Sequence, residues 1–88
     1  MPDDAPFRMS KHARRRLEQR GVTIEQLRRA LLHPDRVESD PEDDELRHAI
    51  KRFHVSGDST VLRVVYNHAV VPWVVVTAFF DRKAKRKP

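Results

Sequence analysis

The sequence predicts an α+β fold in which an N-terminal helical hairpin packs on a three- or four-stranded antiparallel sheet. The first third of the chain repeats its apolar residues at helical spacing, as Ile24, Leu27 and Leu31 do. After Pro34 the pattern changes to the alternation that is typical of strands. With 88 residues, the chain has room for one domain with one small core.

The first helix is expected to begin after Ser10, because serine is a good N-cap. Gly21 suits the left-handed residue that follows a helix end. The preceding residues 1–9 contain two prolines and two aspartates and are expected to be disordered. The domain proper is therefore expected to span residues 10–81.

The second helix is expected between Thr23 and His33. Thr23 and Gln26 have the spacing of a capping box, in which each side chain accepts a hydrogen bond from the other residue's backbone. Pro34 disfavours a helical conformation for the residue before it and so ends the helix.

Strands are expected in the second half of the chain. Arg36–Glu38 is a candidate for a short edge strand, and the alternating stretch Leu46–Val55 follows an acidic loop. Thr60–Tyr66 alternates again after a turn. Val70–Phe80 is apolar on both faces apart from one threonine, which favours a central strand covered on both sides. The register between the strands is left open.

The net charge of +5 is unevenly distributed. Residues 1–33 and 59–88 are basic, residues 34–58 are acidic, and a basic tail occupies residues 82–88. Basic segments of this kind favour a polyanionic partner.

Several other classes of protein are disfavoured by composition. The chain has no cysteine, and its five histidines show no metal-ligand spacing, so we expect no metal and no cofactor. No apolar run is long enough to cross a membrane, and the acidic start differs from a signal peptide. We therefore expect a cytoplasmic protein.

The first helix has polar residues on the face that should pack inward. This face comprises Met9, His12, Ala13, Arg16, Leu17 and Arg20. In one interpretation the arginines lay their methylenes along the apolar surface and put their charges in water. In the other, His12 titrates in a cleft where Arg16, one turn away, holds an anion.

Short motifs along the chain carry a family resemblance. They are His12-Ala13-x-x-Arg16, then Arg20-Gly21-Val22, the Thr-capped second helix ending in Leu31-x-x-Pro34, and Val74-Val75-x-Thr77-Ala78-Phe79. From about Ser10 to Phe80 the chain resembles a bacterial family of small uncharacterised domains grouped with RelE-like toxins. That group lies within the barnase, EndoU, colicin and RelE class of metal-independent ribonucleases.

The resemblance implies a RelE-like fold whose open sheet face binds RNA, with cleavage through the substrate's own 2′-hydroxyl. It maps the suspected active site onto His12 and Arg16, with Thr77 at the matching place on the last strand. It also implies a toxin that a neighbouring antitoxin protein neutralises.

Cleavage of this kind needs a base, an acid and cations that stabilise the charge on phosphate. His12 is the candidate base or acid, and arginine is the natural bidentate phosphate ligand. Further candidates for RNA or phosphate binding are Arg15, Arg20, Lys51, Arg52, Arg63, Tyr66, Arg82 and Lys83.

Three residues on the strands have structural alternatives. Arg63 lies between two valines on an apolar face, so it binds either a phosphate or a carboxylate such as that of Glu38. His48 is either a half-buried sheet residue or part of the same cleft. Trp73 either stacks on a base or belongs to the core.

The leading functional hypothesis is therefore an RNA-binding, metal-independent endoribonuclease of toxin type. The alternative is a non-catalytic module of the same fold that binds nucleic acid or a partner protein. A third alternative is a structural subunit whose half-covered sheet completes a homodimer.

Overall fold

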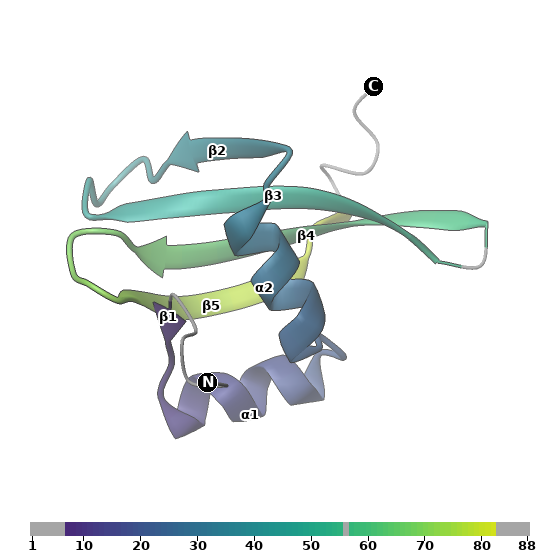
Figure 1. Cartoon of the computed structure of the whole chain (residues 1–88), viewed down its shortest axis with the longest axis horizontal. Helices are drawn as coiled ribbons and strands as arrows, with labels where there is room; N and C mark the ends of the chain where they lie inside the picture. Colours follow the sequence, from purple (N-terminus) through teal and green to yellow (C-terminus); the bar gives the residue numbers. More distant parts are fainter. Residues whose placement is uncertain (1–6, 56, 83–88) are drawn as a thin grey trace.

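The computed structural model describes residues 7–55 and 57–82 and has an α+β fold with two helices and a five-stranded mixed sheet (Figure 1). The strand order in the sheet is β1-β5-β4-β3-β2. Neither of the two described helices has the length and apolar character needed to cross a bilayer. In chain order the elements are β1 (Phe7–Arg8), α1 (Lys11–Gln19), α2 (Ile24–Leu32), β2 (Arg36–Ser39), β3 (Leu46–Val55), β4 (Asp58–Asn67) and β5 (Trp73–Phe80).

The number and direction of the strands correct the prediction of three or four antiparallel strands. Phe7 and Arg8, which were expected to belong to a disordered segment 1–9, form β1 and pair parallel with Trp73 and Val74 of β5. A strand of two residues is too short to show an alternating pattern. It is held because the Phe7 side chain is buried in the core.

Both helices begin as their capping residues predict. Ser10 Oγ accepts a hydrogen bond from the Ala13 amide at 3.0 Å, and Thr23 and Gln26 form the complete capping box. Helix α1 ends in a Schellman motif, with Val22 N–H bonded to Leu17 O at 2.9 Å and Gly21 N–H to Glu18 O at 3.1 Å. Gly21 has the left-handed φ of +75° that this motif requires.

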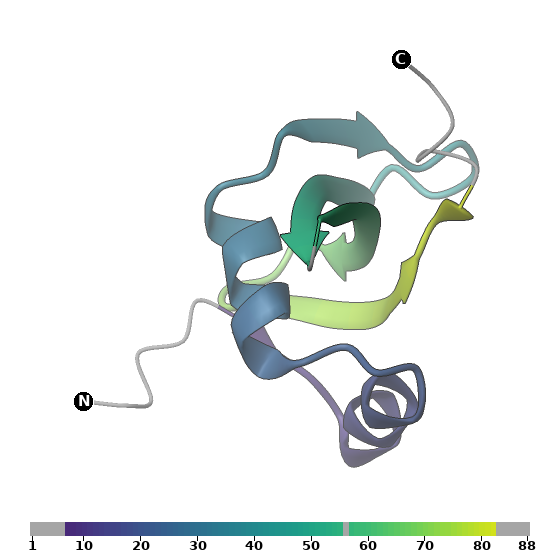
Figure 2. The ribbon, with the colours of Figure 1, turned by 90° about the vertical axis from the view of Figure 1, so that its right-hand side faces the viewer.

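The two helices follow one another closely but do not form an antiparallel pair. Figure 2 views α1 nearly along its axis, whereas α2 runs across the view. Helix α1 packs against β5, and α2 packs across β3 and β4. A single core joins them to one face of the sheet, comprising Phe7, Leu17, Val22, Leu27, Ala30, Leu31, Ala49, Leu62, Val64, Tyr66, Val75 and Ala78.

The register settles which residues share the opposite, helix-free face. Leu62, Val64 and Tyr66 of β4 lie in the core, so Arg63 faces away from the helices. His48 of β3 stands opposite Val65 of β4 and Glu38 of β2. Three polar side chains from three adjacent strands therefore lie on one face.

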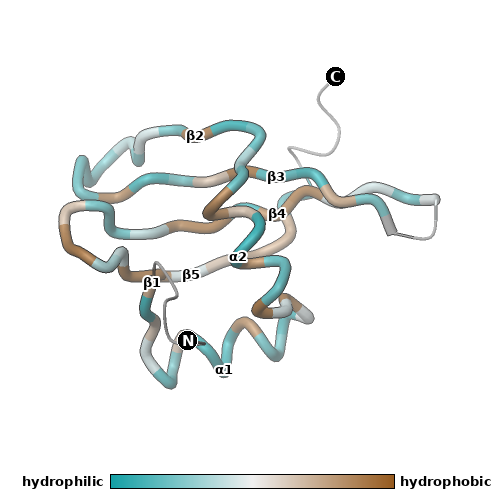
Figure 3. The backbone as a smooth tube through the Cα atoms, viewed as in Figure 1, coloured by the Kyte–Doolittle hydropathy of each residue, from teal (hydrophilic) through white to brown (hydrophobic). Residues whose placement is uncertain are grey.

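Strand β5 differs from the central, doubly covered strand that its apolar run predicts. It starts at Trp73, after Pro72, and β4 is the central strand. A bulge between the pairs Val65–Thr77 and Tyr66–Val75 leaves Val76 as the extra residue, 47% exposed. Most residues of α1 are hydrophilic, whereas β4 and β5 contain hydrophobic stretches (Figure 3).

Candidate nucleic-acid interface

Helix α1 presents an exposed cationic surface. Ala13 and Leu17 are its buried residues and pack it against β5. Lys11, Arg14, Arg15 and Arg16 are exposed, and no ion pair joins any of them to another residue in the described ranges. The one acidic residue of the helix is Glu18. We call these four cations the α1 cationic surface.

His12 lies in a shallow hollow within this surface. The hollow has a volume of about 230 Å³ and is lined by Lys11, His12 and Arg15. We call it the His12 hollow. Arg16 is exposed but does not line it. The imidazole of His12 thus shares the hollow with the side chains of Lys11 and Arg15.

Arg20 connects the end of α1 to β5. Its Nη1 donates to Thr77 Oγ1 at 2.9 Å and to the Ala78 carbonyl at 3.0 Å. Both acceptors are uncharged, so the guanidinium keeps its net charge and its remaining donors. His12 lies eight residues, or about 12 Å along the helix axis, from Arg20. The contacts therefore join Thr77 to Arg20 rather than to His12.

Two of the predicted phosphate ligands, Lys51 and Arg52 of β3, make hydrogen bonds within the domain. Lys51 Nζ donates to the His33 carbonyl at 2.9 Å, which satisfies a backbone acceptor at the C-terminal end of α2, and lies 3.8 Å from Asp35. Arg52 Nη1 donates to Ser59 Oγ at 3.2 Å across the hairpin. Lys51 therefore completes α2, and Arg52 ties β3 to β4.

Arg63 is the centre of an internal polar network on the helix-free face. Its Nε donates to Asp81 Oδ2 at 2.8 Å, and its Nη1 lies 3.3 Å from Glu38 Oε1. The alternative in which Arg63 binds a carboxylate such as Glu38 is confirmed. With its charge matched by two carboxylates and its side chain 17% exposed, Arg63 is not placed to bind an external phosphate.

His48 extends this network to the acidic loop. Arg63 Nη1 lies 3.0 Å from His48 Nδ1, and His48 Nε2 lies 2.7 Å from Asp40 Oδ1. The hydrogen bond from His48 lowers the pKa of Asp40, and the backbone N–H groups of Glu42 and Asp43 act in the same direction. His48 is thus the half-buried sheet residue of the structural alternative.

The prediction that Tyr66 binds RNA is wrong, because the Tyr66 side chain is buried. It is 3% exposed, and its ring packs against Trp73 with centroids 4.7 Å apart. The alternation of β4 points it into the core, as it does Val64. Trp73 accordingly packs against the core. Arg82 is exposed, and Lys83 lies outside the described residues.

Sequence reasoning missed four residues. Lys11 and Arg14 belong to the α1 cationic surface, and the charge count of the helix would have found them. Asp40 and Asp81 are the carboxylates that complete the Arg63 network. The lone arginine on an apolar strand face indicated that carboxylate partners were needed, but not which ones. No group of three or more residues that could hold a metal ion occurs in the described ranges.

Comparison with known proteins gives one match. Neither the curated proteins nor the solved structures include one that is significantly similar to this chain. A family of domains of unknown function, DUF4258, matches residues 9–80, which include both helices and strands β2 to β5. The chain therefore belongs to the DUF4258 family of domains of unknown function.

Proposed function

We propose that this protein binds RNA through the α1 cationic surface. The observation that carries the proposal is the concentration of four exposed cations within residues 11–16 of one helix. Arg36, Lys51 and Arg63 of the sheet lie beside protein carboxylates, whereas Arg8, Arg47 and Arg52 form no ion pair among the described residues but are spread over two strands. The four cations of α1 have none in the described part of the chain.

Such a surface is suited to the phosphate backbone. Arginine donates two parallel hydrogen bonds to a phosphate, and each cation that neutralises a phosphate releases counterions. Exposed helical cations can follow a flexible strand without a deep cleft. The RelE-like resemblance of the His12–Gly21 segment supports RNA rather than another polyanion.

A second candidate function is metal-independent cleavage of the bound RNA. The observation that favours it is the position of His12 between Lys11 and Arg15 in the His12 hollow. A neutral imidazole there would take the proton of a 2′-hydroxyl, and the 2′-oxygen would attack the adjacent phosphorus. The 5′-oxygen would leave with a proton returned by the imidazolium, giving a 2′,3′-cyclic phosphate.

The biological setting that the resemblance supports is a toxin neutralised by an antitoxin protein. An acidic antitoxin segment would compete with RNA for the α1 cationic surface. The toxin role is tested by inducing expression of the wild type and of His12→Ala in bacteria and measuring growth. Toxicity of the wild type alone supports a catalytic toxin, whereas toxicity of both supports a toxin that acts by binding.

The proposed function is tested with labelled single-stranded RNA in EDTA. Fluorescence anisotropy measures binding, and gel analysis with end-group detection measures cleavage. We expect Lys11→Gln with Arg15→Gln to weaken binding, and Arg29→Gln to leave it unchanged because Arg29 pairs with Glu25. Equal affinity of all three proteins would overturn the proposed surface. RNA binding without cyclic-phosphate products would support the alternative function, a non-catalytic RNA-binding module.

A further inference from the structure

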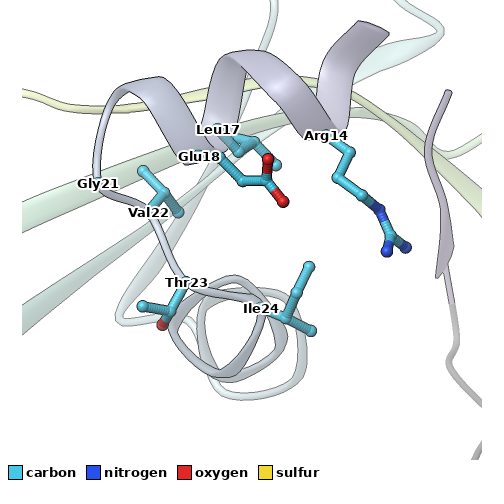
Figure 4. A pocket seen from close by; sticks show the side chains of 7 residues that line it. All are labelled: Arg14, Leu17, Glu18, Gly21, Val22, Thr23 and Ile24. Carbon is cyan, nitrogen blue, oxygen red and sulfur yellow. The ribbon is translucent and has the colours of Figure 1, made fainter. Parts of the chain in front are cut away.

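A second hollow lies between the end of α1 and the start of α2 (Figure 4). Its volume is about 360 Å³, which is within the range of small-ligand sites. We call it the Glu18 hollow. It is lined by Arg14, Leu17, Glu18, Gly21, Val22, Thr23 and Ile24.

The walls of the Glu18 hollow combine apolar and charged groups. Leu17 and Val22 are buried beneath it, and Ile24 is 41% exposed on its α2 side. The side chains of Arg14 and Glu18 both point into the space (Figure 4). No ion pair joins these two residues to each other or to any other part of the described chain. Both charges therefore remain available to a ligand.

Glu18 needs an explanation on a surface that binds RNA, because a carboxylate repels phosphate. It favours binding only where it accepts hydrogen bonds from the nucleic acid. Its two oxygens match two parallel donors, and among the RNA bases guanine offers them, as N1–H and the 2-amino group on one edge. Adenine and cytosine present one amino donor beside a ring acceptor, which the carboxylate would repel.

We propose that the Glu18 hollow is a guanine subsite of the RNA-binding surface, in which Glu18 recognises the base. The base lies against Ile24 and Leu17, and Arg14, one turn before Glu18, binds a phosphate of the same strand. This inference rests on the proposed function and adds sequence preference to it.

The two hollows share one side of α1. Arg15 lies three residues from Glu18, and Lys11 lies three from Arg14, so these side chains are neighbours on the helix surface. A strand that occupies the His12 hollow can therefore continue into the Glu18 hollow. The guanine would then lie a short distance along the strand from the phosphodiester beside His12.

The test compares short single-stranded RNAs that differ at one base. Otherwise identical oligonucleotides carry guanosine, inosine or adenosine, and inosine lacks only the 2-amino donor. We expect the wild type to bind the guanosine RNA about tenfold more tightly than the adenosine RNA, with inosine between them. Glu18→Gln should lose the guanosine preference, because the neutral amide offers one acceptor in place of two and its N–H donor is suited to the ring acceptor of adenine.

Glu45→Gln is the matched control, because it makes the same charge change in the exposed loop before β3. It should raise the affinity for all three RNAs slightly and keep the guanosine preference. Equal affinity of the wild type for the three RNAs would overturn the guanine subsite while the proposed function stands. A guanosine preference that persists in Glu18→Gln would overturn the subsite in the same way. A wild type that binds none of the RNAs would overturn both proposals.

Discussion

Arg63 and His48 meet through a hydrogen bond whose direction is fixed by chemistry. Arg63 Nη1 lies 3.0 Å from His48 Nδ1, and a guanidinium can only donate. His48 Nδ1 is therefore the acceptor and carries no proton. Nε2 carries the proton and donates it to Asp40 Oδ1 at 2.7 Å. Both ring nitrogens of His48 serve the fold, so His48 is not an acid or base for RNA, and His12 is the histidine that lies within the α1 cationic surface.

The tautomer of His48 is the first prediction. We expect the ¹⁵N chemical shifts of its imidazole at pH 8.5 to show a protonated Nε2 and an unprotonated Nδ1, because Arg63 occupies the Nδ1 lone pair. Histidine-selective ¹⁵N–¹H correlation spectra measure this directly. In Arg63→Met the constraint disappears, and the shifts should move towards the mixture seen in free histidine. A protonated Nδ1 in the wild type would contradict the network.

The second prediction concerns stability. Arg63→Met should lower the free energy of unfolding by about 2–3 kcal/mol, because it removes the guanidinium that bonds to the largely buried Asp81 carboxylate and leaves Glu38 with Arg36 as its remaining cation. Urea unfolding followed by circular dichroism measures the change. Arg36→Met is the control, since Arg36 also pairs with Glu38 but is 56% exposed, and should cost less than about 0.5 kcal/mol. Similar losses in the two variants would show that the network is not stabilising.

The third prediction is a pH dependence that comes from Asp40. The hydrogen bond from His48 lowers the pKa of Asp40 in the folded protein, so the unfolded chain takes up this proton first as the pH falls. The stabilisation is complete above the ordinary aspartate pKa of about 3.9 and is lost as the pH falls through the lowered value.

Comparison of the wild type with Asp40→Asn isolates this contribution. The unfolding free energies of the two proteins, measured between pH 7 and pH 3, should differ most at neutral pH and converge towards pH 3. A difference that stays constant over this range would contradict the lowered pKa.

The fourth prediction concerns the attachment of α1 to the sheet. Arg20→Ala should lower the free energy of unfolding by about 1 kcal/mol, because Arg20 donates to both Thr77 and Ala78. Thr77→Val removes only one of the two acceptors and should cost less. A double-mutant cycle measures the Arg20–Thr77 coupling. Zero coupling would show that the hydrogen bond is not populated in solution.

The elements that local chemistry determines could be predicted from the sequence. Ser10 and Thr23 fix the helix starts through side-chain hydrogen bonds within four residues, and β3 begins and ends where its alternation does. Phe7 and Arg8 form a strand only because β5 lies beside them, which no local pattern reveals. The excess of cations on α1 was visible in its composition.

The partners of polar residues depended on register, which the sequence leaves open. Tyr66 could be excluded as an RNA ligand only once the core-facing parity of β4 was known. Arg63 reaches Asp81 because the chain continues past β5 beside β4, where the Asp81 amide bonds to the Val61 carbonyl. Lys51 bonds to the end of α2 for a similar reason, since α2 packs on β3. These contacts join residues that are 18 positions apart in the sequence.

The cations of α1 that have no protein carboxylate beside them are proposed to bind the RNA backbone, and salt dependence measures this binding most directly. The dissociation constant for single-stranded RNA is measured from 50 to 300 mM salt for the wild type, for Lys11→Gln with Arg15→Gln, and for the paired control Arg29→Gln. Each lost phosphate contact should reduce the log–log slope by about 0.7, so the double variant should lose about 1.4 and the control nothing. Identical slopes for the three proteins would contradict backbone binding by α1.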